Sequence, residues 1–173
     1  MIQDQTQGRD RTDFISPPAR GMAAQGILLH PDGVRLLMLD MAHRPCPWLP
    51  GGSSKGQESP HDTMTRLAKT QLGLDLGFAD LGFAFVDHTI PKAGTNFKER
   101  FNHGFALQLT EQQASSARPL LDAGPDLQGF DWLTPDEIGE RCEAHHVNRV
   151  VVGLRWLANP GYTVIMRNGV VVR

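Results

Sequence analysis

The sequence predicts an α/β domain, because apolar runs typical of strands alternate with segments in which apolar residues recur at helical spacing. Two pairs of apolar runs flank one clearly marked helix, and a second helical pattern follows late in the chain. With 173 residues, 40% of them hydrophobic, the chain is long enough to bury a sizeable core. We expect residues 20–173 to form a single domain and the polar residues 1–19 to form a flexible N-terminal arm.

Composition limits the classes of partner. The formal net charge is −2, without the excess of positive charge that a general nucleic-acid or membrane-surface binder carries. No apolar run approaches the roughly 20 residues that span a bilayer, and the first residues lack the apolar core of a signal peptide. We therefore expect a cytoplasmic protein that binds a small molecule, with no nucleic-acid or membrane partner. Cys46 and Cys142 lack the close spacing of a zinc or redox pair, so we expect two free thiols.

The first predicted elements form a hairpin. Residues 22–30 and 34–40 are apolar-rich and are separated by Pro31-Asp32-Gly33, whose residue types favour a turn. Residues 42–57 contain three prolines and three glycines, which predicts a long loop without regular structure.

A helix is predicted over residues 60–72. Ser59 is suited to cap its N-terminus, Pro60 to occupy its first position, and Asp62 follows three residues after the cap. Gly73 provides the stop. The buried face of this helix is predicted to consist of Met64, Leu67, Ala68 and Leu72.

The remaining elements follow from the same patterns. We expect strands over 81–90, 101–109 and 130–133, a helix opened by Thr134-Pro135, a buried helix over 147–157, and a terminal hairpin over 163–172 around Asn168-Gly169.

The segment from Trp48 to Leu74 resembles the Nudix box, which runs Gly, five residues, Glu, seven residues, Arg-Glu-aliphatic, one residue, Glu-Glu, one residue, Gly, aliphatic. The positions in register without a gap are Gly52, Glu58, Arg66, Ala68, Gly73 and Leu74. The resemblance covers roughly residues 22–142. It implies a Nudix-type α/β/α sandwich with a mixed central sheet, and it leaves a homodimer possible.

Three carboxylates of the box are absent. In the family they lie at i, i+3 and i+4 of the helix and collect Mg²⁺ against a diphosphate. The matching residues here are Leu67, Thr70 and Gln71, which cannot supply that charge. We therefore predict no metal site of the usual kind, no cofactor, and no ordinary Nudix hydrolysis of diphosphates.

The remaining polar residues of the motif and its neighbours are the candidates for function. We expect Glu58 to pair with Arg66, and His61 to face solvent. As catalytic candidates we take Glu58, His88 and His103, because a carboxylate and imidazoles meeting in one cleft can exchange protons. The candidate ligand-binding residues are Arg44, Trp48, Gly51, Gly52, Lys98 and Arg100, with Lys92 as a further cation.

Three functions stay open. The first is binding of a ligand without hydrolysis, and the second is metal-independent acid–base chemistry on a small metabolite. The third, the alternative to both, is hydrolysis of a nucleoside diphosphate-type substrate with metal ligands recruited from outside the box, such as Glu58, Asp87, Glu99 and Glu111.

Overall fold

The computed structural model describes residues 21–42, 44–91, 93–94, 98–120 and 126–172. The predicted N-terminal arm and Lys92 lie outside the described residues. None of the described helices is long and apolar enough to cross a membrane.

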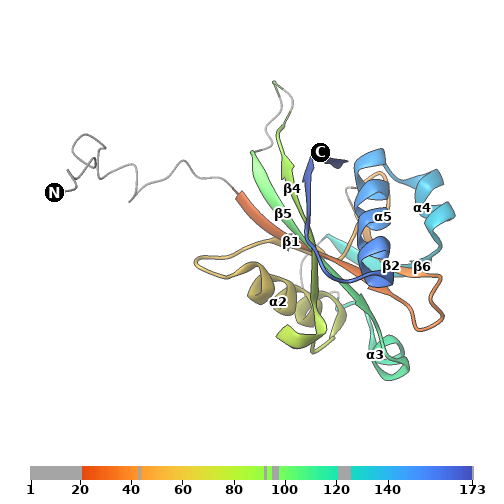
Figure 1. Cartoon of the computed structure of the whole chain (residues 1–173). Coiled ribbons are helices and arrows are strands. Elements are labelled where there is room, and N and C mark those ends of the chain that lie inside the picture. The colour runs from red at the N-terminus through yellow and green to blue at the C-terminus, as the bar shows by residue number, and fades with distance from the viewer. Residues whose placement is uncertain (1–20, 43, 92, 95–97, 121–125, 173) are drawn as a thin grey trace.

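The fold is built on one mixed sheet of eight strands (Figure 1). The strands are β1 (Gly21–Leu29), β2 (Leu36–Met41), β3 (Gly51–Ser53), β4 (Gly82–Thr89), β5 (Arg100–Gln108), β6 (Leu127–Leu133), β7 (Val164–Arg167) and β8 (Val170–Val171). Their order is β6-β2-β1-β5-β4-β7-β8, with β3 pairing β1 outside this path. The β1–β5 and β4–β7 pairs are parallel and the others antiparallel, so the expected mixed α/β sheet is confirmed.

Helix α2 (Pro60–Leu72) covers one face of the sheet and has the predicted bounds. Ser59 and Asp62 form a reciprocal capping box, and Gly73 closes the helix with a left-handed φ of 68°. Met64 and Leu72 are fully buried in a core that includes Leu28 and Phe105 of the sheet.

Helix α5 (Ala144–Ala158) covers the opposite face (Figure 1). It buries Val150 and Val152 against Ile27 and Phe85, which point to that side of β1 and β4. Gly153 lets the helix approach β1 closely: a Cβ atom at this position would lie 2.6 Å from Ile27 Cγ1. His145 and Arg149 of the same helix line the cavity described below.

Replacing Gly153 by alanine is therefore expected to destabilise the protein by about 1–3 kcal/mol, because overpacking outweighs the better helix propensity of alanine. Gly139 in α4 (Pro135–Arg141) is the matched control, since a Cβ there meets nothing within 4 Å. Gly139→Ala is expected to be neutral or to stabilise by up to ~1 kcal/mol. Urea unfolding of both variants measures the difference, and equal effects would contradict this packing.

Several expected elements differ in the structure. The loop over 42–57 does contain regular structure, because Gly51–Ser53 pair with Ala23–Gln25 as β3. Two short helices were not predicted, a 3₁₀ turn at Phe78–Asp80 and α3 at Glu111–Ser116, which Thr110 caps. The expectation that His61 faces solvent is wrong: its ring stacks on Phe78 and meets Phe105 edge-on, with centroids 4.1 and 4.4 Å away.

The terminal hairpin forms as predicted, at Asn168 (φ 50°) and Gly169 (φ 78°). Its first strand, β7, joins the main sheet beside β4. The Gly169 N–H thereby reaches the buried Asp87.

Candidate functional site

A cavity of about 520 Å³ lies on the face of the sheet that α5 covers, a size suited to a small-molecule ligand. The described residues that line it come from the N-terminal part of α5, the chain after β2, β1 and β3, and the adjoining ends of β4 and β5. Its lining residues are Ala23, Gln25, Leu39, Met41, Arg44, Trp48, Gly51, Gly52, Ser53, Thr89, Pro91, Lys98, Arg100, Asn102, Glu143, His145 and Arg149. All six residues expected from the sequence to bind a ligand are among them.

A buried ion pair anchors the cavity floor. Asp87 is inaccessible to solvent and accepts hydrogen bonds from Arg149 Nε at 2.8 Å and Nη2 at 2.6 Å. Arg149 is 3% exposed and also donates from Nη1 to Gln25 Oε1 at 3.0 Å. Because the pair neutralises itself, Arg149 adds rigidity and hydrogen-bonding groups to the floor and little net charge.

Two amide side chains complete this floor. Gln25 and Asn102 are 4% and 5% exposed and project from β1 and β5 toward α5. Asn102 Nδ2 donates to Thr89 Oγ1 at 2.8 Å. The side-chain carbonyl oxygen of Asn102 accepts no hydrogen bond from the described residues and is available to a ligand. A ligand in the cavity thus meets buried groups that can both donate and accept.

Sequence reasoning missed the three floor residues Gln25, Asn102 and Arg149, and it named Asp87, the partner of Arg149, only as a possible metal ligand. The signal that was available is a polar residue inside an otherwise apolar run, as with Gln25 in β1 and Arg149 in α5. Burial of such a residue costs free energy that a partner offsets, and a single sequence does not identify that partner.

An aromatic wall is formed by Trp48. The guanidinium carbon of Arg44 lies 4.3 Å from the Trp48 ring centroid, in a cation–π arrangement. The indole also meets the His146 ring edge-on, with centroids 4.1 Å apart. The ring that lines the cavity is therefore held in place by its neighbours.

His146 is fully buried, and neither of its ring nitrogens has a hydrogen-bond partner within the described part of the chain. Burial, together with the nearby His145, Arg149 and Arg44, lowers the pKa of His146 to about 3. The ring is therefore neutral at physiological pH and supports Trp48 by packing.

The mouth of the cavity is positively charged. Lys98 and Arg100 lie where the chain enters β5, and Arg44 lies across the cavity on the loop after β2. Glu143 is the acidic residue that faces these three cations in the lining. The arrangement favours an anionic ligand.

Leu67, Thr70 and Gln71, the residues matched to the carboxylates of the Nudix box, make structural contacts of their own. Leu67 is 7% exposed and packs beside Gly52, so it belongs to the core. Thr70 is exposed, and its hydroxyl lies 3.5 Å from the Leu67 carbonyl oxygen of its own helix.

Gln71 forms a two-point clamp on the cavity wall. Its Oε1 accepts from the Gly51 N–H at 3.0 Å, and its Nε2 donates to the Gly51 carbonyl oxygen at 2.9 Å. A carboxylate cannot make both bonds, because it has no N–H to donate. The amide thus fits this backbone, and a glutamate would set a charge against the Gly51 carbonyl.

Replacing Gln71 by glutamate is expected to destabilise the protein by about 1–3 kcal/mol at neutral pH, the cost of a partly buried acceptor that loses its donor. Thr70→Glu introduces the same charge on the exposed neighbouring position and is expected to change stability by less than about 0.5 kcal/mol. Denaturant unfolding compares the two variants, and equal costs would show that the clamp contributes nothing.

Glu58 is engaged by Arg66 through two hydrogen bonds, from Nε to Oε1 at 2.6 Å and from Nη2 to Oε2 at 2.8 Å, which confirms the expected pair. The Lys55 N–H and the Thr63 hydroxyl also donate to it. The Arg66 guanidinium, above all, lowers the pKa of Glu58 to about 2. Such a carboxylate is a weak base near neutral pH.

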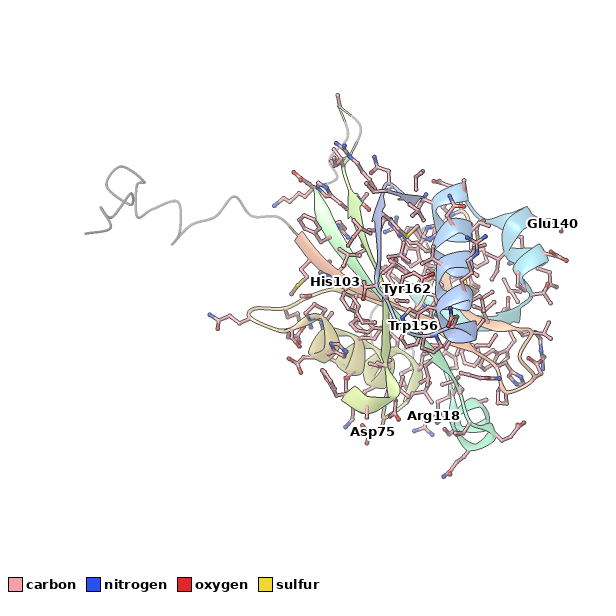
Figure 2. All side chains as sticks on the ribbon, in the orientation of Figure 1. Asp75, His103, Arg118, Glu140, Trp156 and Tyr162 are labelled. Atoms are coloured by element: carbon pink, nitrogen blue, oxygen red, sulfur yellow. The ribbon has the colours of Figure 1, made fainter. Side chains whose placement is uncertain are left out.

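The two strand histidines do not line the cavity. His103 of β5, labelled in Figure 2, stacks on Phe83, whose ring packs against the core on the α2 side. Its Nδ1 lies 3.3 Å from the Ala23 carbonyl oxygen. Burial lowers its pKa. His88 of β4 stacks on Phe101 and pairs through Nε2 with Glu99 Oε1 at 2.5 Å. The structure therefore does not bring Glu58, His88 and His103 together at the cavity.

Structural comparison identifies the fold. The Nudix domain of NrtR from Shewanella oneidensis, solved in complex with ADP-ribose, superimposes with a TM-score of 0.64 at 12% identity, covering 86% of this chain and 99% of that one. A MutT Nudix hydrolase from Burkholderia pseudomallei gives a TM-score of 0.62 at 17% identity, with 78% and 98% covered. The protein has the Nudix fold.

A third Nudix-fold structure, the MutT protein of Methanosarcina mazei, gives a TM-score of 0.59 at 14% identity, with 82% and 96% covered. Comparison of the sequence with protein-family models and with curated proteins gives no match. At these identities the likeness establishes the Nudix fold and leaves the activity to be argued from the site.

Proposed function

We propose that this Nudix-fold protein binds an anionic small molecule with a planar ring in its cavity and does not hydrolyse diphosphates through a metal cluster at the box. The observation that carries the proposal is the Gln71 clamp on Gly51, together with Leu67 in the core. Two of the three positions that hold metal ligands in an intact box are thereby committed to structural contacts.

Three features of the cavity support ligand binding: an aromatic ring, positive charge and buried hydrogen-bonding groups. Trp48 offers an aromatic ring with the Arg44 guanidinium over it, and Arg44, Lys98 and Arg100 offer positive charge for phosphate or carboxylate groups. Gln25 and Asn102 add hydrogen-bonding groups on a floor that water reaches poorly. A nucleotide or a related diphosphate has both the ring and the charge that such a site selects.

The alternative of hydrolysis with recruited ligands receives little support from the geometry. Glu58 is bound by Arg66, Asp87 by Arg149 and Glu99 by His88, while Glu111 lies in the first turn of α3. The four carboxylates named for that alternative lie on separate elements, and three of them already have a cationic or imidazole partner.

ADP-ribose is the first probe, because the Nudix domain of NrtR, which shares this fold, was solved with that ligand. Calorimetric titration of the full chain with ADP-ribose is expected to give the same affinity in Mg²⁺ and in chelator. Lys98→Met and Arg100→Gln are expected to weaken binding by roughly 10- to 100-fold each, since a hydrogen bond to a charged group is worth about 1.5–3 kcal/mol.

Lys69→Met is the matched control, because Lys69 is exposed on α2, away from the cavity. Its affinity should equal that of the unaltered protein. Binding that requires Mg²⁺ would contradict the proposal, as would equal affinities of Lys98→Met, Arg100→Gln and the control. If ADP-ribose does not bind, the same titration with inorganic pyrophosphate and with AMP tests separately whether the cavity requires negative charge or a ring. If none of the three compounds binds, the proposal is overturned.

A further inference from the structure

The two cysteines of the chain lie beside each other near the cavity. Cys142 Sγ donates to the Pro47 carbonyl oxygen at 3.4 Å, and Pro47 directly follows Cys46. Cys46 is also the neighbouring thiol with which Cys142 interacts, and both residues are half-buried. The two thiols are free, as expected, and the fold brings them together in a way that the sequence spacing does not reveal.

Each cysteine belongs to a different wall. Cys46 lies between Arg44 and Trp48, on the loop after β2. Cys142 ends α4 and directly precedes Glu143, the residue before α5 and a lining residue of the cavity. A bond between the two sulfurs would join segments that the described structure holds together only by weaker contacts, such as the Cys142–Pro47 hydrogen bond and the Trp48–His146 ring contact.

We propose that Cys46 and Cys142 form a reversible disulfide that ties the loop of residues 44–48 to the α4–α5 junction and fixes these two walls of the cavity relative to each other. The inference is independent of which ligand the cavity takes. It adds a redox-sensitive modification site at the cavity edge.

The chemistry balances with a peroxide or with a small-molecule disulfide as the oxidant. With glutathione disulfide, Cys46 sulfur attacks one sulfur of the oxidant, the oxidant's S–S bond breaks, and one glutathione thiol leaves. Cys142 sulfur then attacks Cys46 sulfur, the mixed disulfide breaks, and the second glutathione thiol leaves. Burial and the neighbouring Cys46 thiol raise the pKa of Cys142 to about 11, so Cys142 is protonated near neutral pH and the first attack is assigned to Cys46. With hydrogen peroxide, Cys46 sulfur takes one oxygen, the O–O bond breaks, and sulfenic acid and water form. Cys142 sulfur then attacks Cys46 sulfur, the S–O bond breaks, and a second water leaves. The two thiols lose two electrons and two protons in total.

The test uses the full chain, which has no cysteine besides these two. The protein is equilibrated in glutathione buffers of rising oxidised fraction, alkylated and analysed by intact and peptide mass spectrometry. We expect a monomer that has lost both alkylatable thiols, a cross-linked peptide joining Cys46 to Cys142, and full reversal by dithiothreitol. Cys46→Ser and Cys142→Ser are expected to give only mixed disulfides with glutathione under the same conditions.

The effect of the disulfide on the two cavity walls is measured by hydrogen exchange of the unaltered protein in its oxidised and reduced forms. This experiment needs no variant and no ligand. Exchange of the loop over 44–48 is expected to slow on oxidation, and the midpoint of thermal unfolding to rise by several degrees. Mixed disulfides, intermolecular dimers or over-oxidised thiols as the only products would overturn the disulfide. If the disulfide forms but the hydrogen exchange of the loop over 44–48 does not change, the proposal that the disulfide fixes the two walls is overturned. Neither result bears on ADP-ribose affinity, so failure here is distinct from failure of the proposed function.

Discussion

Replacing Asp87 by alanine is expected to destabilise the protein by about 3–5 kcal/mol, the usual cost of leaving one member of a buried ion pair without its partner. Arg149 would keep its charge at 3% exposure, and the Gly169 N–H, which lies 3.0 Å from Asp87 Oδ1, would lose its acceptor. Urea unfolding at neutral pH measures the loss. Because Asp87 links β4, α5 and the β7–β8 turn, the variant is also expected to loosen the cavity floor.

The matched control is the double variant Asp87→Ala/Arg149→Met, which removes both charges. Its destabilisation should fall short of the sum of the two single variants by at least ~1–3 kcal/mol, the coupling expected for residues in one network. Additive losses, or a loss below about 1 kcal/mol for Asp87→Ala alone, would mean that the pair does not hold these elements together.

Acidification from pH 7 to pH 5 is expected to cost about 2 kcal/mol of stability through His146 alone. Its folded pKa of about 3 lies below the unfolded value, which is near 6.5. The stabilisation from the neutral buried ring is therefore complete above pH 6.5 or so and is lost as the pH falls toward the folded pKa. Protonation would place a charge in a site without hydrogen-bond partners among the described residues, directly against Trp48.

His146→Phe keeps a ring against Trp48 and removes the titration. Denaturant unfolding of both proteins at a series of pH values isolates His146, because His61, His103 and His145, whose pKa values are also lowered, are common to both. The unaltered protein should lose about 2 kcal/mol more than the variant between pH 7 and pH 5. Parallel stability curves would refute the buried, unpartnered state of this ring.

Local chemistry made some elements predictable to the residue. The bounds of α2 follow from Ser59, Pro60 and Gly73, which act on their immediate neighbours and need no distant contact. The cavity rim was also predictable, because the resemblance to the Nudix box sets a register from Trp48 to Leu74, and Lys98 and Arg100 follow in the expected order. The three-residue strand β3 was missed, since Gly51 and Gly52 have low strand propensity and pair only because β1 lies alongside.

The other features of the site depend on contacts between residues far apart in the sequence. The Asp87–Arg149 pair joins β4 to α5, and no local pattern links these positions. The strand histidines were placed on the correct strands, but their direction depends on register. The β4–β5 register shifts between Phe83 and Phe85, and Asp87 ends up facing α5 while His88 stacks on Phe101 instead of lining the cavity. The Cys46–Cys142 pair is likewise a product of the fold.

Phosphate release is the most direct test of the central claim, that the cavity binds its ligand without metal-dependent hydrolysis. The full chain is incubated with nucleoside triphosphates, nucleoside diphosphate derivatives including ADP-ribose, dinucleotides and prenyl diphosphates, in Mg²⁺, in Mn²⁺ and in chelator. With Leu67 in the core and Gln71 clamped on Gly51, we predict no release above the protein-free control under any condition, alongside calorimetric binding of at least one anionic ring compound in chelator. Turnover that disappears with chelator would contradict the account and would show that carboxylates outside the box assemble a working metal site.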